Sequence, residues 1–260
     1  MRLLIGSNSR LAQDLLRIFP NEYVVVNGRF KNTEVFFSEN HEIIFNKRIS
    51  EVFYFPAITD PLQSGTEISE INFHRPKEIM EKLDDKVKFV TFGTVLENTN
   101  VKNNYVISKR QLANAMHASG NLHFQLNTLY NLDLELKSHM FLASLLDCAL
   151  KGCEFKMSSG TQYREYHLYE EVACYIHHAS HLLNGIVEVS NGKGFLLKSL
   201  AKAVFEEFRQ TTNLKISNYT PPGEQYTRRS STIFEEFGAI NGDLIQLVEN
   251  IKGTDFGTRS

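Results

Sequence analysis

The sequence predicts an α/β fold with a parallel sheet, and two observations carry this prediction. Short apolar runs lack the strict alternation of strands with one wet face, as is typical of strands covered on both faces. They are separated by longer segments whose apolar residues recur at helical spacing. The expected strands are Arg2–Ile5, Tyr23–Val26, Glu42–Phe45, Val52–Phe55 and Val87–Thr91 in the first third of the chain, with Phe124–Leu126 and Val187–Ser190 further on.

Length and composition indicate a globular protein. A chain of 260 residues with 42% hydrophobic residues can form one large domain or two packed lobes. The net charge of -2 argues against a general binder of nucleic acids or anionic membranes. No apolar run is long enough to span a membrane, and the first residues are too short for a signal segment. We therefore expect a cytoplasmic protein without a nucleic-acid or membrane partner.

The three cysteines, Cys148, Cys153 and Cys174, are an odd number and form no Cys-x-x-Cys pair. Free thiols in a reducing compartment are the expected state. The histidines His177, His178 and His181 lie at helical spacing without an acidic or cysteine companion, so a solvated helix face is preferred over a metal site. We expect no metal.

The first turn of the chain has the features of a phosphate-binding turn. The strand Arg2–Ile5 runs into Gly6-Ser7-Asn8-Ser9-Arg10-Leu11-Ala12 and then into an amphipathic helix. A dinucleotide site needs small residues here, because backbone N–H groups and a helix N-terminus approach the pyrophosphate. Ser9 and Ala12 replace the second and third glycines of a Gly-x-x-Gly-x-x-Gly turn, so an ordinary strand-to-helix turn is the alternative. Ser9 is expected to be strained, since it takes the position of a glycine.

The end of the second strand indicates which dinucleotide the turn would bind. Asn27-Gly28-Arg29 follows Tyr23–Val26 and contains no acidic residue for ribose hydroxyls. An arginine suits a 2′-phosphate. The sequence thus favours NADPH, with NAD as the alternative and Arg10 as a second contact. A solvated loop residue is the other interpretation of Arg29.

Tyr105 and Lys109 share one face of a predicted helix. A cation one turn away favours the phenolate and is expected to lower the pKa of the tyrosine, which suits acid/base chemistry. Thr94 follows the strand Val87–Thr91 and supplies a hydroxyl for a substrate oxygen. The three side chains together predict a catalytic group.

In their order along the chain, from Leu3 to about Gly238, these segments resemble the extended short-chain dehydrogenase/reductase family, in its nucleotide-sugar epimerase, dehydratase and reductase group. The resemblance rests on the glycine turn, on Tyr105 with Lys109, and on Leu126-Asn127-Thr128-Leu129-Tyr130, Tyr163-Arg164-Glu165-Tyr166 and Val189-Ser190-Asn191-Gly192-Lys193.

The resemblance implies a Rossmann-type doubly wound parallel sheet with a smaller C-terminal substrate-binding lobe. Residues 1–130, joined by 165–190, would form the dinucleotide-binding domain, and 131–164 with 191–260 the lobe. Tyr105 would be the general acid/base, and Lys109 would bind the nicotinamide ribose and lower the pKa of the tyrosine. The implied cofactor contacts are Gly6, Ser9, Arg10, Leu11, Arg29, Ala57, Thr91 and Lys109, and the implied substrate contacts are Thr94, Tyr105, Asn127, Arg164 and Arg228.

The chain departs from the family pattern in three places. Phe92 stands where the catalytic Ser or Thr is expected, so we assign the hydroxyl to Thr94, which points the same way on a strand, with Thr91 in reserve. Pro221 replaces an arginine of the substrate site, which leaves Arg228 or Arg229 to contact the second phosphate. The chain is also short between residues 30 and 85, so weak or lost dinucleotide binding is one expectation.

Three functions remain open at this stage. The first is an NADPH-dependent reductase of a nucleotide-diphospho-4-keto-6-deoxy-sugar with Tyr105 as proton donor, favoured by Arg29. The second is an NAD-dependent nucleotide-sugar 4-epimerase, and the third a catalytically silent nucleotide-binding relative, favoured by Phe92 and Ser9. Dehydration is disfavoured because Gly93 and Val95 flank Thr94 where dehydratases of the group carry acids. Whether the protein is a homodimer is left open.

Overall fold

A computed structural model describes residues 1–131, 140–220 and 244–253. Its centre is a six-stranded sheet in which every neighbouring pair of strands is parallel. The strands across the sheet are β10 (Gly185–Val189), β5 (Leu122–Leu126), β4 (Lys88–Thr94), β3 (Glu51–Tyr54), β1 (Arg2–Ile5) and β2 (Tyr23–Val26). The predicted parallel α/β sheet is confirmed.

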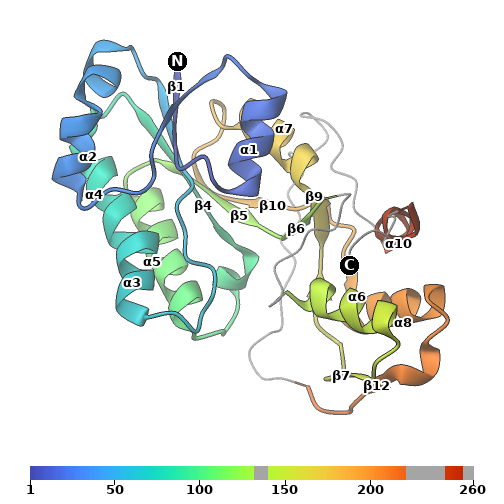
Figure 1. The fold of residues 1–260 in the computed structure, drawn as a ribbon. Coiled ribbons are helices and arrows are strands. Elements are labelled where there is room, and N and C mark those ends of the chain that lie inside the picture. Colours follow the sequence, from blue (N-terminus) through green and yellow to red (C-terminus); the bar gives the residue numbers. More distant parts are fainter. Residues whose placement is uncertain (132–139, 221–243, 254–260) are drawn as a thin grey trace.

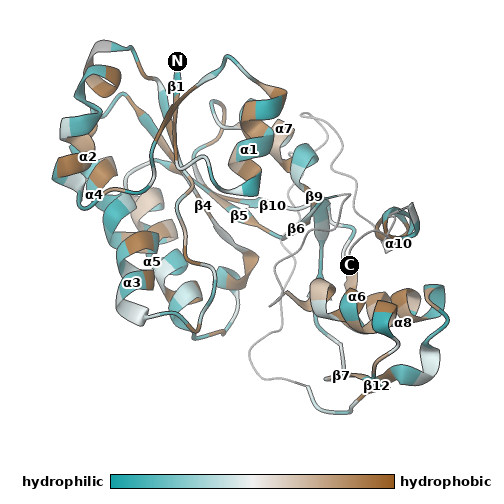
Figure 2. Cartoon of the chain, viewed as in Figure 1, coloured by the Kyte–Doolittle hydropathy of each residue, from teal (hydrophilic) through white to brown (hydrophobic). Residues whose placement is uncertain are grey.

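Helices cover both faces of this sheet (Figure 1). On one face lie α1 (Arg10–Ile18) and α7 (Tyr169–Ala179); on the other lie α2 (Thr33–Glu39), α3 (Gly65–Ser69), the turn η2 (Glu70–His74), α4 (Arg75–Lys82) and α5 (Asn104–Ala118). Successive strand residues alternate between the two cores, so Leu4 packs with Leu15 of α1 while Ile5 packs with Leu112 of α5. Most helices carry both hydrophobic and hydrophilic stretches (Figure 2), as a helix with one face on a sheet requires.

The predicted strand Glu42–Phe45 is wrong. These residues form a π-helical turn, η1 (Glu42–Asn46), close behind α2, and Ile44 N–H donates to the Asn40 carbonyl at 2.9 Å. Ile44 is buried while Phe45 is 55% exposed. A four-residue apolar run suits a strand or a buried helical turn equally well, and here the continuing helix decides.

Because residues 42–46 are helical, they add no strand beside β2, and this determines the strand order of the sheet. The strand order β2-β1-β3-β4-β5 is the second common doubly wound order, and β10 extends it. On one side of β1 the sheet therefore has a single further strand, β2, which is the edge strand. Ligands of such sheets bind where the strand order reverses, at the carboxyl ends of the strands, here beside β1 and β3.

A smaller group of elements lies beside the carboxyl ends of the sheet (Figure 1). It contains paired short strands and helices around a separate core that includes Leu145, Leu200 and Phe205. Its elements are β6 (Thr128–Tyr130), α6 (Phe141–Lys151), β7 (Phe155–Met157), β8 (Tyr163–Arg164), β9 (Tyr166–Leu168), β11 (Phe195–Leu196), α8 (Leu197–Glu207), η4 (Thr211–Asn213), β12 (Leu214–Ile216) and α10 (Leu244–Gly253). The domain boundaries given above remain a proposal.

Two of the cysteines expected to be free form a disulfide. Cys148 lies in the last turn of α6 and Cys153 follows Gly152, which ends the helix with a φ of +65°. This left-handed residue turns the chain back and brings the two Cα atoms to 4.9 Å. Cys174 is the free thiol among the described residues. The cysteine pattern therefore gives no support to a reducing compartment.

None of the described helices has the length and apolar character needed to cross a bilayer.

Candidate functional site

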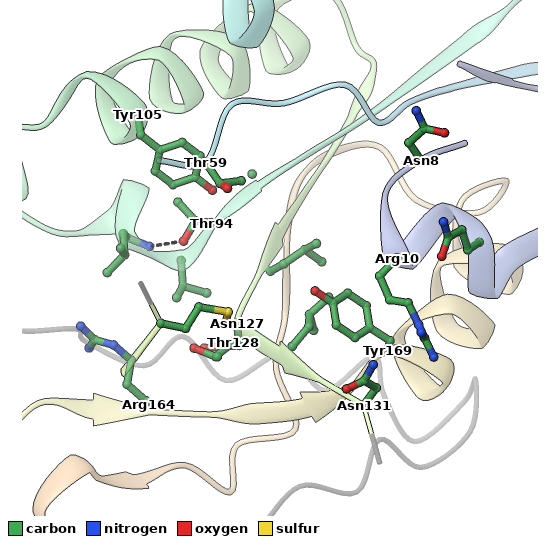
Figure 3. A pocket seen from close by; sticks show the side chains of 17 residues that line it. Asn8, Arg10, Thr59, Thr94, Tyr105, Asn127, Thr128, Asn131, Arg164 and Tyr169 are labelled. Atoms are coloured by element: carbon green, nitrogen blue, oxygen red, sulfur yellow. Dashed lines mark hydrogen bonds between the residues drawn. The ribbon is translucent and has the colours of Figure 1, made fainter. Parts of the chain in front are cut away.

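A cavity of about 530 Å³ opens at the carboxyl ends of β4 and β5. It is lined from both parts of the chain: Thr94 ends β4, Tyr105 comes from α5, Asn127 follows β5, Arg164 lies in β8 and Arg10 begins α1. Figure 3 shows these side chains around a common space. The structure thus brings together five of the residues that the sequence predicts.

Tyr105 and Thr94 lie at one end of this cavity. Asn103 caps α5 by accepting the Val106 N–H at 2.9 Å, which places Tyr105 in the first turn of the helix. Its phenol is directed toward Thr94 and Thr59 (Figure 3). The Thr94 hydroxyl accepts the Leu96 N–H at 3.3 Å, so its proton remains available to a substrate oxygen.

Lys109 does not line the cavity. Its side chain is buried, with 4% of the residue exposed, and its Nζ donates to the Phe92 carbonyl at 2.8 Å. Burial lowers the pKa of Lys109 to about 8, although Glu97 acts in the opposite direction. Its predicted contact with a ribose remains a prediction.

The pKa of Tyr105 shifts in the direction opposite to the one predicted from sequence spacing. Burial raises the pKa of the phenol well above its ordinary value, and the negative charge of Glu97 raises it further. Lys109 faces the Phe92 carbonyl rather than holding a phenolate. Tyr105 is a neutral phenol at physiological pH, as at its ordinary pKa, and the raised pKa makes it a weaker acid.

Of the three residues considered for the catalytic hydroxyl, Thr94 is the one in the cavity. Phe92 stacks on Phe55 and Phe124, with ring centroids 4.5 and 6.1 Å apart, and belongs to the core below α7. The Thr91 hydroxyl is fully buried and hydrogen-bonded to His123 Nδ1 at 2.7 Å. Thr91 lies outside the cavity lining, so the structure favours Thr94 over the reserve assignment.

The N-terminal turn has the geometry of a phosphate-binding turn in part. Gly6 has a φ of +84°, and a Cβ there would lie 2.9 Å from Pro56 Cδ, so the position requires glycine. Ser9 is not strained as predicted: its φ of -76° and ψ of 144° are ordinary, because it caps α1 and accepts the Ala12 N–H at 3.2 Å. Arg10 lines the cavity and donates to Asp14 at 3.2 Å.

Other predicted cofactor residues lie away from the cavity. The Leu11 side chain is buried in the core, and Ala57 is exposed. Arg29 is exposed on a turn in which its N–H donates to Asn27 Oδ1 at 2.9 Å. None of the three lines the cavity, and their roles remain predictions.

Two further predicted substrate residues, Asn127 and Arg164, line the same cavity. Asn127 is 7% exposed and its Nδ2 donates to the Val189 carbonyl at 2.9 Å. Its Oδ1 is buried without a hydrogen-bond partner among the described residues. Arg164 donates from Nη1 to the Tyr163 carbonyl at 2.9 Å and also lines the cavity. Arg228 lies outside the described residues.

The sequence reasoning missed several residues at this site. Glu97 lies directly behind the cavity, and its signal was present, since Thr94-x-x-Glu97 is a capping-box pattern and forms that motif here. Further polar lining residues gave no sequence signal that separates them from loop residues. They are Asn8, Gln13, Thr59, Thr128, Asn131 and Tyr169.

The histidine cluster on α7 has a structural role. His177 is 9% exposed, stacks on Phe19 with ring centroids 3.6 Å apart, and contacts Arg2 and Tyr23, so the predicted solvated face is wrong for this residue. His178 and His181 are exposed. Within the described ranges, no three His, Cys, Asp or Glu side chains form a potential metal site.

Solved structures similar over nearly the whole chain include nucleotide-sugar enzymes. The dTDP-glucose 4,6-dehydratase of Bacillus anthracis, in complex with NAD, matches with a TM-score of 0.74 at 11% identity, covering 96% of each chain. The UDP-glucose 4-epimerase of Thermotoga maritima, with UDP-glucose, matches with a TM-score of 0.74 at 14% identity, covering 97% of this chain and 99% of that chain. The chain has the fold of the extended short-chain dehydrogenases/reductases.

A third similar structure is the UDP-N-acetylglucosamine 4-epimerase of Methanobrevibacter ruminantium in complex with UDP-N-acetylmuramic acid, with a TM-score of 0.73 at 11% identity, covering 97% of this chain and 96% of that chain. No protein-family model and no curated protein matches the sequence. The comparisons thus establish the fold, including its Rossmann-type sheet, and the chemistry has to be argued from the cavity.

Proposed function

We propose that the protein is a nicotinamide-dependent oxidoreductase that acts on the sugar of a nucleotide sugar. The observation that carries this proposal is the single cavity that joins Tyr105 and Thr94 to Asn127 and Arg164. The phenol of Tyr105 and the hydroxyl of Thr94 suit a sugar carbonyl or alcohol. The Arg164 guanidinium suits a diphosphate, because it can meet phosphate oxygens in bidentate fashion. The unpaired Asn127 Oδ1 is a hydrogen-bond acceptor and suits a hydroxyl of the sugar or ribose.

The N-terminal turn fits a dinucleotide. Gly6 brings the backbone to the start of α1, whose free N–H groups and dipole favour a phosphate. Asn8 and Arg10 extend from this turn into the cavity. These residues would hold the pyrophosphate, and a nicotinamide cofactor, when bound, supplies or accepts a hydride. The solved dehydratase of the same fold contains NAD.

Tyr105 acts as the proton donor in this proposal. Its phenol is neutral at physiological pH, so the proton is in place when the sugar carbonyl becomes an alkoxide. Thr94 orients the same oxygen through a hydrogen bond. In the reductive direction this arrangement suits an NADPH-dependent reductase of a nucleotide-diphospho-4-keto-6-deoxy-sugar. Arg29, exposed after β2 with no acid beside it, supports NADPH over NAD.

A 4-epimerase is the second candidate, because two of the three solved structures described above are 4-epimerases. The test is to incubate the protein with NADPH or NADH and UDP- or dTDP-linked 4-keto-6-deoxyglucose, and to follow cofactor oxidation. A reductase oxidises NADPH and loses this activity in Tyr105→Phe. An epimerase contains bound NAD and shows no net oxidation. If the purified protein contains no bound NAD and neither cofactor changes its melting temperature at millimolar concentration, both enzymatic proposals fail.

A further inference from the structure

Glu97 is a buried carboxylate directly behind the cavity. It lies in the 3₁₀ turn η3 (Val95–Asn98), with 5% of the residue exposed. One oxygen, Oε1, accepts the Thr94 N–H at 2.7 Å, and the other, Oε2, accepts the Gln125 Nε2–H at 2.9 Å. His123 Nε2 lies 3.2 Å from Oε2. A carboxylate with this many partners has a fixed position.

The strand is shaped to admit this carboxylate. A Cβ on Gly93 would lie 1.9 Å from Glu97 Oε1 and 2.3 Å from His123 Nε2, so a glycine is required for the carboxylate and the imidazole to meet under the strand. His123 is in turn fixed from behind by its hydrogen bond to the Thr91 hydroxyl at 2.7 Å. The arrangement links the residues below the strand to the backbone of Thr94.

Glu97 also acts electrostatically on the two residues of the Tyr-x-x-x-Lys motif. Burial opposes its charge, but His123, Gln125 and the Thr94 N–H outweigh burial and hold the pKa of Glu97 below its ordinary value. It is therefore a carboxylate at neutral pH. Its charge raises the pKa of Tyr105 and of Lys109. The charged or titratable groups of this region are Glu97 on η3, Tyr105, Lys109 and Arg110 on α5, and His123 on β5; Arg110 Nε donates to the Glu97 carbonyl at 2.9 Å.

We propose that Glu97 is a positioning residue of the active site: it fixes the backbone of Thr94 and supplies the buried negative charge that acts on Tyr105 and Lys109. The inference rests on the proposed function for its catalytic consequence. Glu97 does not line the cavity, so it acts through the other residues. Its carboxylate partly offsets the cost of burying the lysine cation.

The test compares Glu97→Gln with Glu97→Asp and with the control Glu81→Gln, an exposed glutamate on α4 paired with Lys77. The first readout is the titration of Lys109, followed by NMR of labelled lysine side chains and assigned with Lys109→Met. In Glu97→Gln the midpoint should fall from about 8 to lower pH, by about one pH unit. Glu97→Asp should retain most of the wild-type midpoint, and Glu81→Gln should leave it unchanged.

The second readout is steady-state kinetics. Glu97→Gln should lower kcat by about 10²-fold, because misplaced reacting groups cost this much, while KM for NADPH stays within about twofold of the wild type since no contact to the cofactor is removed. A Lys109 midpoint and a kcat both equal to those of the wild type would overturn the proposal. If Glu97→Gln does not fold, Glu97→Asp provides the test. Its shorter side chain withdraws the carboxylate from the Thr94 N–H, so a kcat of Glu97→Asp equal to that of the wild type would refute the positioning role.

The two proposals fail in different ways. If the wild-type protein neither binds nor oxidises NADPH, the proposed function is wrong, and the Lys109 titration still tests the electrostatic role of Glu97. If the wild type turns over and the Glu97→Gln titration and kcat are both unchanged, the proposed function stands and the role of Glu97 is wrong.

Discussion

Replacing Gly93 by alanine should destabilise the protein strongly. The added Cβ would lie 1.9 Å from Glu97 Oε1 and 2.9 Å from Glu97 Cδ, so the carboxylate has to move. Moving it strains a close-packed interior, which costs about 1–3 kcal/mol. It also breaks the hydrogen bond from the Thr94 N–H, and a hydrogen bond to a charged group contributes about 1.5–3 kcal/mol. We expect a loss of about 3–5 kcal/mol in the free energy of unfolding, a large part of the ~5–15 kcal/mol typical of a folded protein.

Urea denaturation followed by circular dichroism measures this loss. The matched control is Gly253→Ala at the end of α10, where a Cβ meets nothing within 4 Å, and its effect should stay within about 0.5 kcal/mol. The double variant Gly93→Ala/Glu97→Ala should lose less than the sum of the single variants, because the clash is gone once the carboxylate is removed. A loss below about 1 kcal/mol for Gly93→Ala would show that Glu97 moves freely, and would refute a rigid network behind the cavity.

Four further changes test the remaining steps. Tyr105→Phe should lower kcat by about 10²–10⁴-fold while the cofactor still raises the melting temperature, and unchanged turnover would reject its role. Arg164→Ala should raise KM for the nucleotide sugar by at least about tenfold with a smaller effect on KM for NADPH, whereas equal KM values in both proteins would place the diphosphate elsewhere. Burial lowers the pKa of Lys109 from 10.5 to about 8, so the unfolded state binds more protons than the folded state between these pH values. The free energy of unfolding of the wild type, relative to that of Lys109→Met, should therefore rise from pH 8 to 10.5. A difference between the two proteins that is the same at pH 7 and pH 10 in urea denaturation would contradict this. Phe92→Ser should cost about 3–5 kcal/mol without a gain in kcat, since Phe92 packs in the core; a gain in kcat would return the catalytic hydroxyl to this position.

The sequence predicts an element correctly where its pattern of apolar residues and turn residues fits one kind of secondary structure only. Arg2–Ile5 and Tyr23–Val26 were placed to the residue, because each is a short apolar run closed by a glycine or a turn. Thr94 was preferred to Phe92 from strand alternation, and the structure places its side chain in the cavity. Glu42–Phe45 could not be assigned in the same way, because its apolar run fits two kinds of structure and the packing of α2 selects between them.

The electrostatics of the site could not be predicted from spacing. Lys109 is one turn from Tyr105, yet its Nζ donates to the Phe92 carbonyl, and the charge that acts on the phenol comes from Glu97 on another element. The disulfide between Cys148 and Cys153 was missed for a similar reason. It depends on the left-handed turn at Gly152, which a count of cysteines does not show.

The account depends on Tyr105 protonating a sugar oxygen in a cavity that also binds a nicotinamide cofactor. The direct measurement uses NADPH deuterated at the transferable position of the nicotinamide ring, together with a nucleotide-linked 4-keto-6-deoxy-sugar. The account predicts deuterium on the sugar C4 with wild-type protein, and transfer about 10²–10⁴-fold slower with Tyr105→Phe. Deuterium transfer that is undiminished in Tyr105→Phe, or a wild-type protein that binds the nucleotide sugar and transfers no deuterium from any nicotinamide cofactor, would contradict it.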